Sequence, residues 1–222
     1  MNKTNRLFID TRSGPYPGAV RLNCVGSPEL EFGYYAEAFH EAGQTLVRGL
    51  RGVWKSGGNF SPVGSMKAVP IVYLYWHAME LYLKSIILEG GDILPLHRKA
   101  RIELKATHTL KDLADDVGRI FEEFRWDWSF GSPHFKTGAE FLSILAELQS
   151  VAEIRYPTRK KDGGAVLPPN FRFNLFQFCE LLDSVFEALS LRAFAVTAEL
   201  QQKQEMRAEW RQYEMENSDP SI

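Results

Sequence analysis

The feature that most constrains the fold is a long apolar run near the middle of the chain, from Pro70 to Gly91. It opens with a proline, which a first helical turn accepts, and closes with two glycines. Apolar side chains recur on both faces at helical spacing, and a helix that is apolar all round is normally buried. We therefore predict a central helix that ends at the glycine pair, inside an α-helical domain.

Three polar side chains interrupt this run: His77, Glu80 and Lys84. Their spacing of three and four residues places them in one row on one face of a helix. A buried carboxylate or ammonium group is costly unless it is paired. Two interpretations stay open: an ion pair at a partly solvated edge beside a core histidine, or a polar pocket that other helices of the bundle complete.

The composition is that of an ordinary globular protein, with 222 residues, a 45% hydrophobic share and a 24% charged share. A net charge of −2 argues against a generally basic nucleic-acid binder, although a local basic patch is compatible with it. The two cysteines, Cys24 and Cys179, suggest neither a disulfide framework nor a zinc site. The three ionisable groups of the central run argue against a membrane span. We expect a soluble cytoplasmic protein without a metal ion or other cofactor.

Helix signals divide the rest of the chain. Ser27 is a good N-cap before Pro28, Thr107 or Thr109 can cap a later helix, and Pro157 stops another. Besides the central helix, helices are predicted over residues 28–51, 110–124, 137–154 and 175–215. We predict an all-α, up-and-down bundle of four to five helices with a long C-terminal helix.

Three segments follow from these boundaries. Residues 1–27 are expected to form an extended N-terminal arm, residues 28–200 the helical bundle, and residues 201–222 a C-terminal helix extension and tail. The last helix is too long for its partners, so its end is expected either to fray in solvent or to meet a second subunit or another protein.

Helices joined by short loops run antiparallel, and this zigzag predicts a cluster at one end of the bundle. It brings Glu80, Lys84, His108, Arg155 and Tyr156 together. Such a set suits a phosphate-containing ligand: Arg155 and Lys84 would bind the phosphate, and His108 would act as general acid or base. Glu80 would position the cations or act as a base. No glycine-rich phosphate loop or metal-ligand spacing is present.

Three short motifs resemble the HEPN superfamily of helical bundles: His77-Ala-Met-Glu-Leu-Tyr-Leu-Lys84, Thr107-His-Thr-Leu-Lys-Asp-Leu113 and Glu153-Ile-Arg-Tyr-Pro157. The resemblance covers roughly residues 30–200. It implies an often dimeric bundle with roles in toxin–antitoxin, abortive-infection and RNA-processing systems. Active members are metal-independent ribonucleases in which an Arg is followed by a His.

This chain departs from that pattern. No His follows Arg155, so His108 is expected to supply the imidazole from a neighbouring helix, while Arg101 and His108 fit the spacing elsewhere in the chain. The first hypothesis is a module that binds and cleaves RNA without metal in a prokaryotic defence or toxin system. The alternative is a non-catalytic scaffold or nucleotide-binding subunit that acts through a homodimer or a partner on the C-terminal helix. The expected ligand-binding residues are His77, Lys84 and Tyr156.

Overall fold

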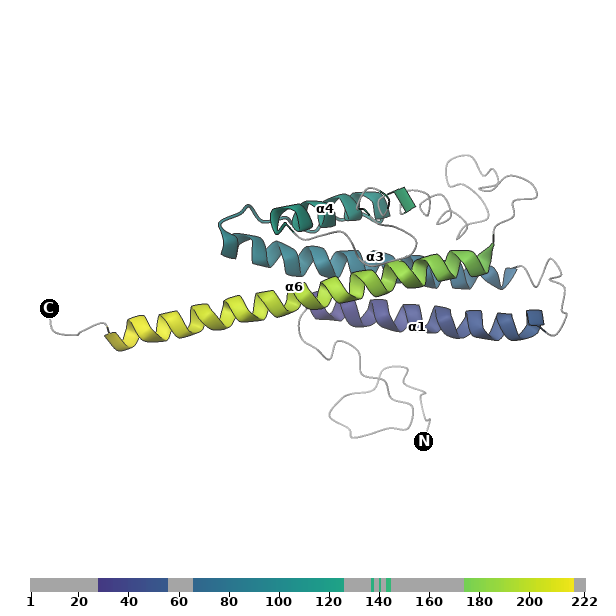
Figure 1. The fold of residues 1–222 in the computed structure, drawn as a ribbon, viewed down its shortest axis with the longest axis horizontal. Helices are drawn as coiled ribbons and strands as arrows, with labels where there is room; N and C mark the ends of the chain where they lie inside the picture. Colours follow the sequence, from purple (N-terminus) through teal and green to yellow (C-terminus); the bar gives the residue numbers. More distant parts are fainter. Residues whose placement is uncertain are drawn as a thin grey trace, which may run out of the picture.

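The chain forms an all-α bundle in the computed structural model, which describes residues 28–55, 66–125, 137, 140, 143–144 and 174–217. The helices are α1 (Pro28–Lys55), α3 (Ala68–Ile93), α4 (Leu110–Glu123) and α6 (Leu175–Asn217), and a short 3-10 helix, η2 (Leu94–His97), follows α3 (Figure 1). No strand occurs in these ranges. The predicted all-α bundle with a long C-terminal helix is confirmed. The predicted N-terminal arm and almost all of the predicted 137–154 helix lie outside the described residues.

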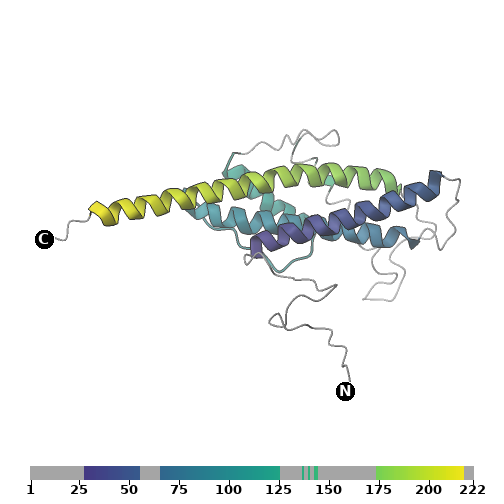
Figure 2. The ribbon, with the colours of Figure 1, turned by 90° about the horizontal axis from the view of Figure 1, so that it is seen from below.

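Helix α3 is the centre of the bundle. It packs against α1, α4 and α6, which surround it in both ribbon views (Figures 1 and 2). Its side chains are buried along nearly the whole length, as the apolar run predicts, and the largest fully buried ones include Trp76, Tyr75, Ile71, Met79, Leu83, Ile86 and Ile87. Burying a large apolar side chain stabilises a fold by about 1.5–3 kcal/mol, so this helix supplies much of the core.

The predicted end of the central helix at the glycine pair is wrong, because α3 continues through both glycines to Ile93. A Cβ atom at Gly90 would lie 2.7 Å from Cγ2 of Ile120, and one at Gly91 would meet the carbonyl oxygen of Ile102. The glycines therefore allow close packing instead of capping the helix. The turn comes later, where Arg98 takes a left-handed φ of 61° after η2.

Contacts between α1 and α3 show that these two helices run antiparallel. Gly33 lies beside Ser85, and Gly43 lies against the ring of Tyr75, so residue numbers rise on one helix as they fall on the other. Helix α6 runs parallel to α3, because Tyr75 contacts Asp183 and Tyr82 packs on Phe186.

Helix α4 does not run antiparallel to α3, and the zigzag expected from the sequence is wrong at this step. His108, just before α4, contacts Glu80 in the middle of α3, and near the other end of α4 Ile120 contacts Gly90. The two helices are therefore parallel. The segment between them reverses the chain, returning along α3 with Ile102 against Gly91.

Helix α6 has 43 residues and is about 65 Å long at 1.5 Å per residue. His97 of η2 pairs with Glu199 of α6. The C-terminal part of α6 projects alone from the bundle in both views (Figures 1 and 2). Several large apolar side chains on the projection are exposed: Met206, Trp210, Tyr213 and Met215.

Across the described part of the chain, no helix combines the length and the apolar character needed to cross a membrane.

Candidate functional site

The candidate site is built around the carboxylate of Glu80, which is only 2% exposed. Its Oε1 accepts hydrogen bonds from Nζ of Lys84 at 2.5 Å and from Nδ1 of His108 at 2.7 Å. Nδ1 of His77 lies 3.7 Å from its Oε2. Three nitrogen-bearing side chains thus surround one buried carboxylate.

Two helices and a connecting loop create this arrangement. His77, Glu80 and Lys84 are one turn apart on α3, which gives them the common face that the sequence predicts. His108 comes from the loop before α4, where Thr109 is the N-cap residue. The backbone N–H of Thr109 donates to Oγ1 of Thr107 at 3.1 Å, which fixes the turn that carries His108.

The surroundings of Glu80 keep it ionised. Burial by itself raises the pKa of this carboxyl, but the nearby His77 ring, the hydrogen bonds from Lys84 and His108 and the charge of Lys84 outweigh burial and lower the pKa to about 2. An ionised carboxylate can only accept hydrogen bonds. The 2.7 Å contact therefore requires Nδ1 of His108 to carry the proton.

His108 is the exposed member of the cluster, with 80% of its side-chain surface accessible. Since Nδ1 is directed at Glu80, the opposite ring nitrogen, Nε2, is the one available at the surface. A neutral imidazole protonated on Nδ1 has a free lone pair on Nε2. The pair therefore has the form of a carboxylate-oriented general base.

The other members of the cluster are more enclosed. Lys84 is 12% exposed and pairs with Glu80. The ring of His77 makes an edge contact with Phe39, with centroids 4.7 Å apart, and stacks on Tyr73. His77 is thus held between two aromatic rings and beside the carboxylate, which suits a positioning role better than direct access to solvent.

The structure brings together four of the six residues proposed from the sequence: His77, Glu80, Lys84 and His108. The other two, Arg155 and Tyr156, lie outside the described residues. The route to this cluster differs from the one expected, because His108 reaches Glu80 through a loop that returns along α3.

The basic cluster at residues 97–101 is largely paired. His97 contacts Glu199, Lys99 contacts Glu123 and Arg101 contacts Asp92 at 2.7 Å. The engagement of Arg101 with Asp92 gives no support to an Arg101–His108 pair.

A second polar cluster, absent from the sequence-based expectations, lies where α1, α3 and α6 meet. Oδ1 of Asp183 accepts hydrogen bonds from Nε2 of His40 at 2.7 Å, from Gln44 at 3.1 Å and from the Tyr75 hydroxyl at 3.0 Å. Burial raises the pKa of Asp183, but these hydrogen bonds more than offset it and lower the pKa. The sequence signal was weak: a His and a Gln one turn apart on α1, and one of several acidic residues in the first turns of α6.

This second cluster is enclosed by ring packing. His40 stacks on Phe186 with centroids 3.9 Å apart and makes an edge contact with Tyr75. The thiol of Cys179 is buried close by, and burial raises its pKa to about 12, so it is a poor nucleophile. We interpret the cluster as a structural clamp between three helices.

Within the described ranges, no group of three His, Cys, Asp or Glu side chains is arranged to hold a metal ion. Comparison of the chain with protein-family models, with curated proteins and with solved structures gives no match.

Proposed function

We propose that this protein is a HEPN-like module that binds RNA and cleaves it without a metal ion, with His108 as the general base. The observation that carries the proposal is the contact between Glu80 and His108. A buried, ionised carboxylate holds Nδ1 of an imidazole whose other side is open to solvent. The HEPN resemblance of the three motifs supplies RNA as the substrate class.

The chemistry assigned to His108 is proton transfer. Nε2 removes the proton from a ribose 2′-hydroxyl, and the oxygen attacks the adjacent phosphorus. A P–O2′ bond forms and the P–O5′ bond breaks, which gives a 2′,3′-cyclic phosphate and a 5′-hydroxyl end. The leaving 5′ oxygen takes a proton from solvent or from protonated His108. Glu80 stabilises the imidazolium that forms in the first step.

The remaining members of the predicted site receive supporting roles. Lys84 and His77 hold Glu80 ionised, which keeps His108 in the required tautomer. Arg155 and Tyr156, predicted from the sequence to join this cluster, would bind the phosphate of the RNA. Arg suits this task because its planar guanidinium donates two parallel hydrogen bonds to a phosphate.

The wider setting is part of the same proposal. From the resemblance we propose a cytoplasmic role in a prokaryotic defence or toxin system, and a homodimer as the working form. The projection of α6 beyond the bundle supports the idea of assembly, because its large apolar side chains Trp210 and Tyr213 are exposed.

The proposal is tested by incubating the protein with single-stranded RNA in the presence of EDTA. We expect the wild type to cleave RNA but not the same sequence as DNA, and His108→Ala to lose about 100-fold or more in rate. Lys111→Ala is the matched control, since this exposed side chain is close in sequence to His108 and pairs with Asp115. Equal cleavage by His108→Ala, or no cleavage by the wild type, would contradict the proposed activity.

The alternative is a non-catalytic scaffold or nucleotide-binding subunit. One observation favours it: Glu80 already has three nitrogen partners, as a purely structural carboxylate would. In that case Glu80→Ala would unfold the protein, and His108→Ala would change neither the rate of RNA cleavage nor the stability of the protein. Thermal shift against a nucleotide panel separates the scaffold from the nucleotide-binding subunit, because only the latter would be stabilised.

A further inference from the structure

A groove lies between η2 and the part of α6 that leaves the bundle. It has a volume of about 410 Å³, and its apolar lining comes from Leu96, Met206 and Trp210. Its basic lining comes from Lys203, Arg207 and Arg211. The groove is separate from the cluster at Glu80, because Leu96 follows Glu80 by 16 residues, or about 24 Å of helix.

The three cations form a row, because they recur every four residues on α6. Within the described part of the chain, none of them has a carboxylate at ion-pair distance. Elsewhere in the bundle the pattern is different: Lys99 pairs with Glu123, and Arg101 with Asp92. A row of cations without acidic partners favours a ligand that carries several negative charges.

The aromatic part of the groove is accessible to solvent. Trp210 is 63% exposed, and Met206 lies one turn before it. The indole N–H of Trp210 donates to Oε1 of Glu214 at 2.9 Å, which holds the ring in place. An exposed indole beside a row of cations is the combination with which proteins bind single strands, since bases stack on the ring and phosphates contact the cations.

We propose that this groove binds single-stranded RNA. Lys203, Arg207 and Arg211 contact successive phosphates, and a base stacks on Trp210. The groove contributes affinity, whereas His108 performs the chemistry about 24 Å away along the bundle. This inference rests on the proposed function for RNA as the ligand.

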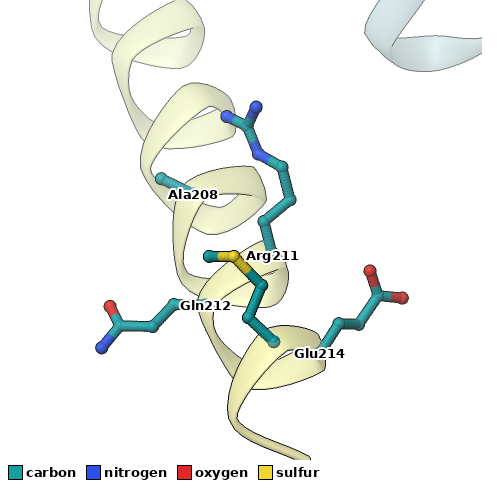
Figure 3. A pocket seen from close by; sticks show the side chains of 5 residues that line it. Ala208, Arg211, Gln212 and Glu214 are labelled. Carbon is teal, nitrogen blue, oxygen red and sulfur yellow. The ribbon is translucent and has the colours of Figure 1, made fainter. Parts of the chain in front are cut away.

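A second hollow near the end of α6 does not support a similar proposal. All its lining residues belong to α6, so it has a single wall, as Figure 3 shows (Figure 3). The groove at Leu96 has walls from two elements.

The test is fluorescence anisotropy of a labelled RNA of about 20 nucleotides, long enough for a single-strand site, measured over a series of salt concentrations. For the double variant Arg207→Gln/Arg211→Gln we expect at least a tenfold loss of affinity at low salt. A plot of the logarithm of the association constant against the logarithm of the salt concentration has a negative slope. This slope should become less steep by about 1.4, since each lost phosphate contact removes about 0.7. Trp210→Ala should weaken binding roughly 5- to 100-fold with an unchanged slope.

The matched control removes two cations that are already paired. Lys99→Gln/Arg101→Gln should leave affinity and slope close to those of the wild type, because Glu123 and Asp92 neutralise these groups. Circular dichroism checks that the fold is retained, which is expected because all the substituted side chains are exposed.

Cleavage kinetics separate this inference from the proposed activity. Groove variants should raise KM and keep kcat, whereas His108→Ala should lower kcat and keep RNA affinity. If His108→Ala loses cleavage but the groove variants bind RNA normally, only the proposed role of the groove is refuted. If the groove variants bind RNA more weakly but His108→Ala cleaves it normally, only the proposed role of His108 is refuted.

Two further outcomes would also refute RNA binding by the groove. One is a wild type that binds no RNA at low salt. The other is a Trp210→Ala variant that binds RNA normally but changes from dimer to monomer in sedimentation, since a second copy would then be the occupant.

Discussion

Replacing Glu80 by Gln tests the energetic role of the buried carboxylate. Glutamine keeps the shape of the side chain but cannot carry the charge that Lys84, His77 and His108 surround. The folded protein lowers the pKa of Glu80 from 4.5 to about 2, which corresponds to about 3 kcal/mol of stabilisation when the group is ionised. We therefore expect Glu80→Gln to lower the free energy of unfolding by about 3 kcal/mol near pH 6.

The sign of the pH dependence follows from the direction of the shift. A carboxyl whose pKa is depressed by folding contributes its full stabilisation above its unfolded pKa, here 4.5. The contribution is lost as pH falls from 4.5 to about 2. The difference between wild type and Glu80→Gln should therefore be largest near pH 6 and shrink towards zero near pH 2.

The assay is urea unfolding of both proteins, followed by circular dichroism from pH 2 to pH 7. Asp115→Asn is the control, because Asp115 forms the same type of pair with a lysine four residues away, but on the exposed surface of α4. Such exposed pairs contribute little, so this variant should match the wild type. A Glu80→Gln protein as stable as the wild type at pH 6, or a difference that does not change with pH, would refute the reasoning.

Two further predictions concern contacts between segments that are distant in the sequence. Gly91→Ala should destabilise the protein by about 2 kcal/mol or more in urea unfolding, because the new methyl group would meet the backbone carbonyl of Ile102. Gly49→Ala is its control, since nothing lies within 4 Å of that position, and a gain of about 0.5–1 kcal/mol is expected; equal effects of the two changes would refute the close approach. Tyr75→Phe should cost about 1 kcal/mol through the lost hydrogen bond to Asp183, and an unchanged unfolding midpoint would count against the clamp.

Periodicity was sufficient to predict the core helices. The helix predicted over residues 110–124 is found as α4, and its apolar side chains at helical spacing are fully buried: Leu110, Leu113, Val117, Ile120 and Phe121. The common face of His77, Glu80 and Lys84 also follows from spacing alone, since helical geometry places such residues in one row. These features depend on local sequence, which is why they could be predicted.

Features that depend on tertiary contacts could not be predicted. The pair Gly90–Gly91 has the sequence of a helix end, but the side chain of Ile120 and the backbone at Ile102 require glycine inside the helix. Only the position of another segment distinguishes these two uses of glycine.

The predicted direction of α4 was wrong for a related reason. The rule that successive helices alternate in direction holds for short loops, whereas residues 98–109 number twelve and can span about 40 Å when extended. A loop of this length can carry the chain back along α3. The expected approach of His108 to the polar row is found, although the geometry behind that expectation was wrong.

The cluster at Asp183 shows a third limit. His40 and Asp183 are 143 residues apart, and each looks like an ordinary polar residue in its own helix. Only the packing of α1 on α6 reveals that they share a hydrogen bond.

The proposed role of His108 requires that Glu80 accepts a hydrogen bond from Nδ1 and leaves Nε2 free. Long-range proton–nitrogen NMR correlations of the neutral imidazole measure this directly. We predict that Nδ1 carries the proton and Nε2 is unprotonated, and that this preference disappears in Glu80→Gln. A proton on Nε2 in the wild type, or two tautomers in rapid exchange, would contradict it.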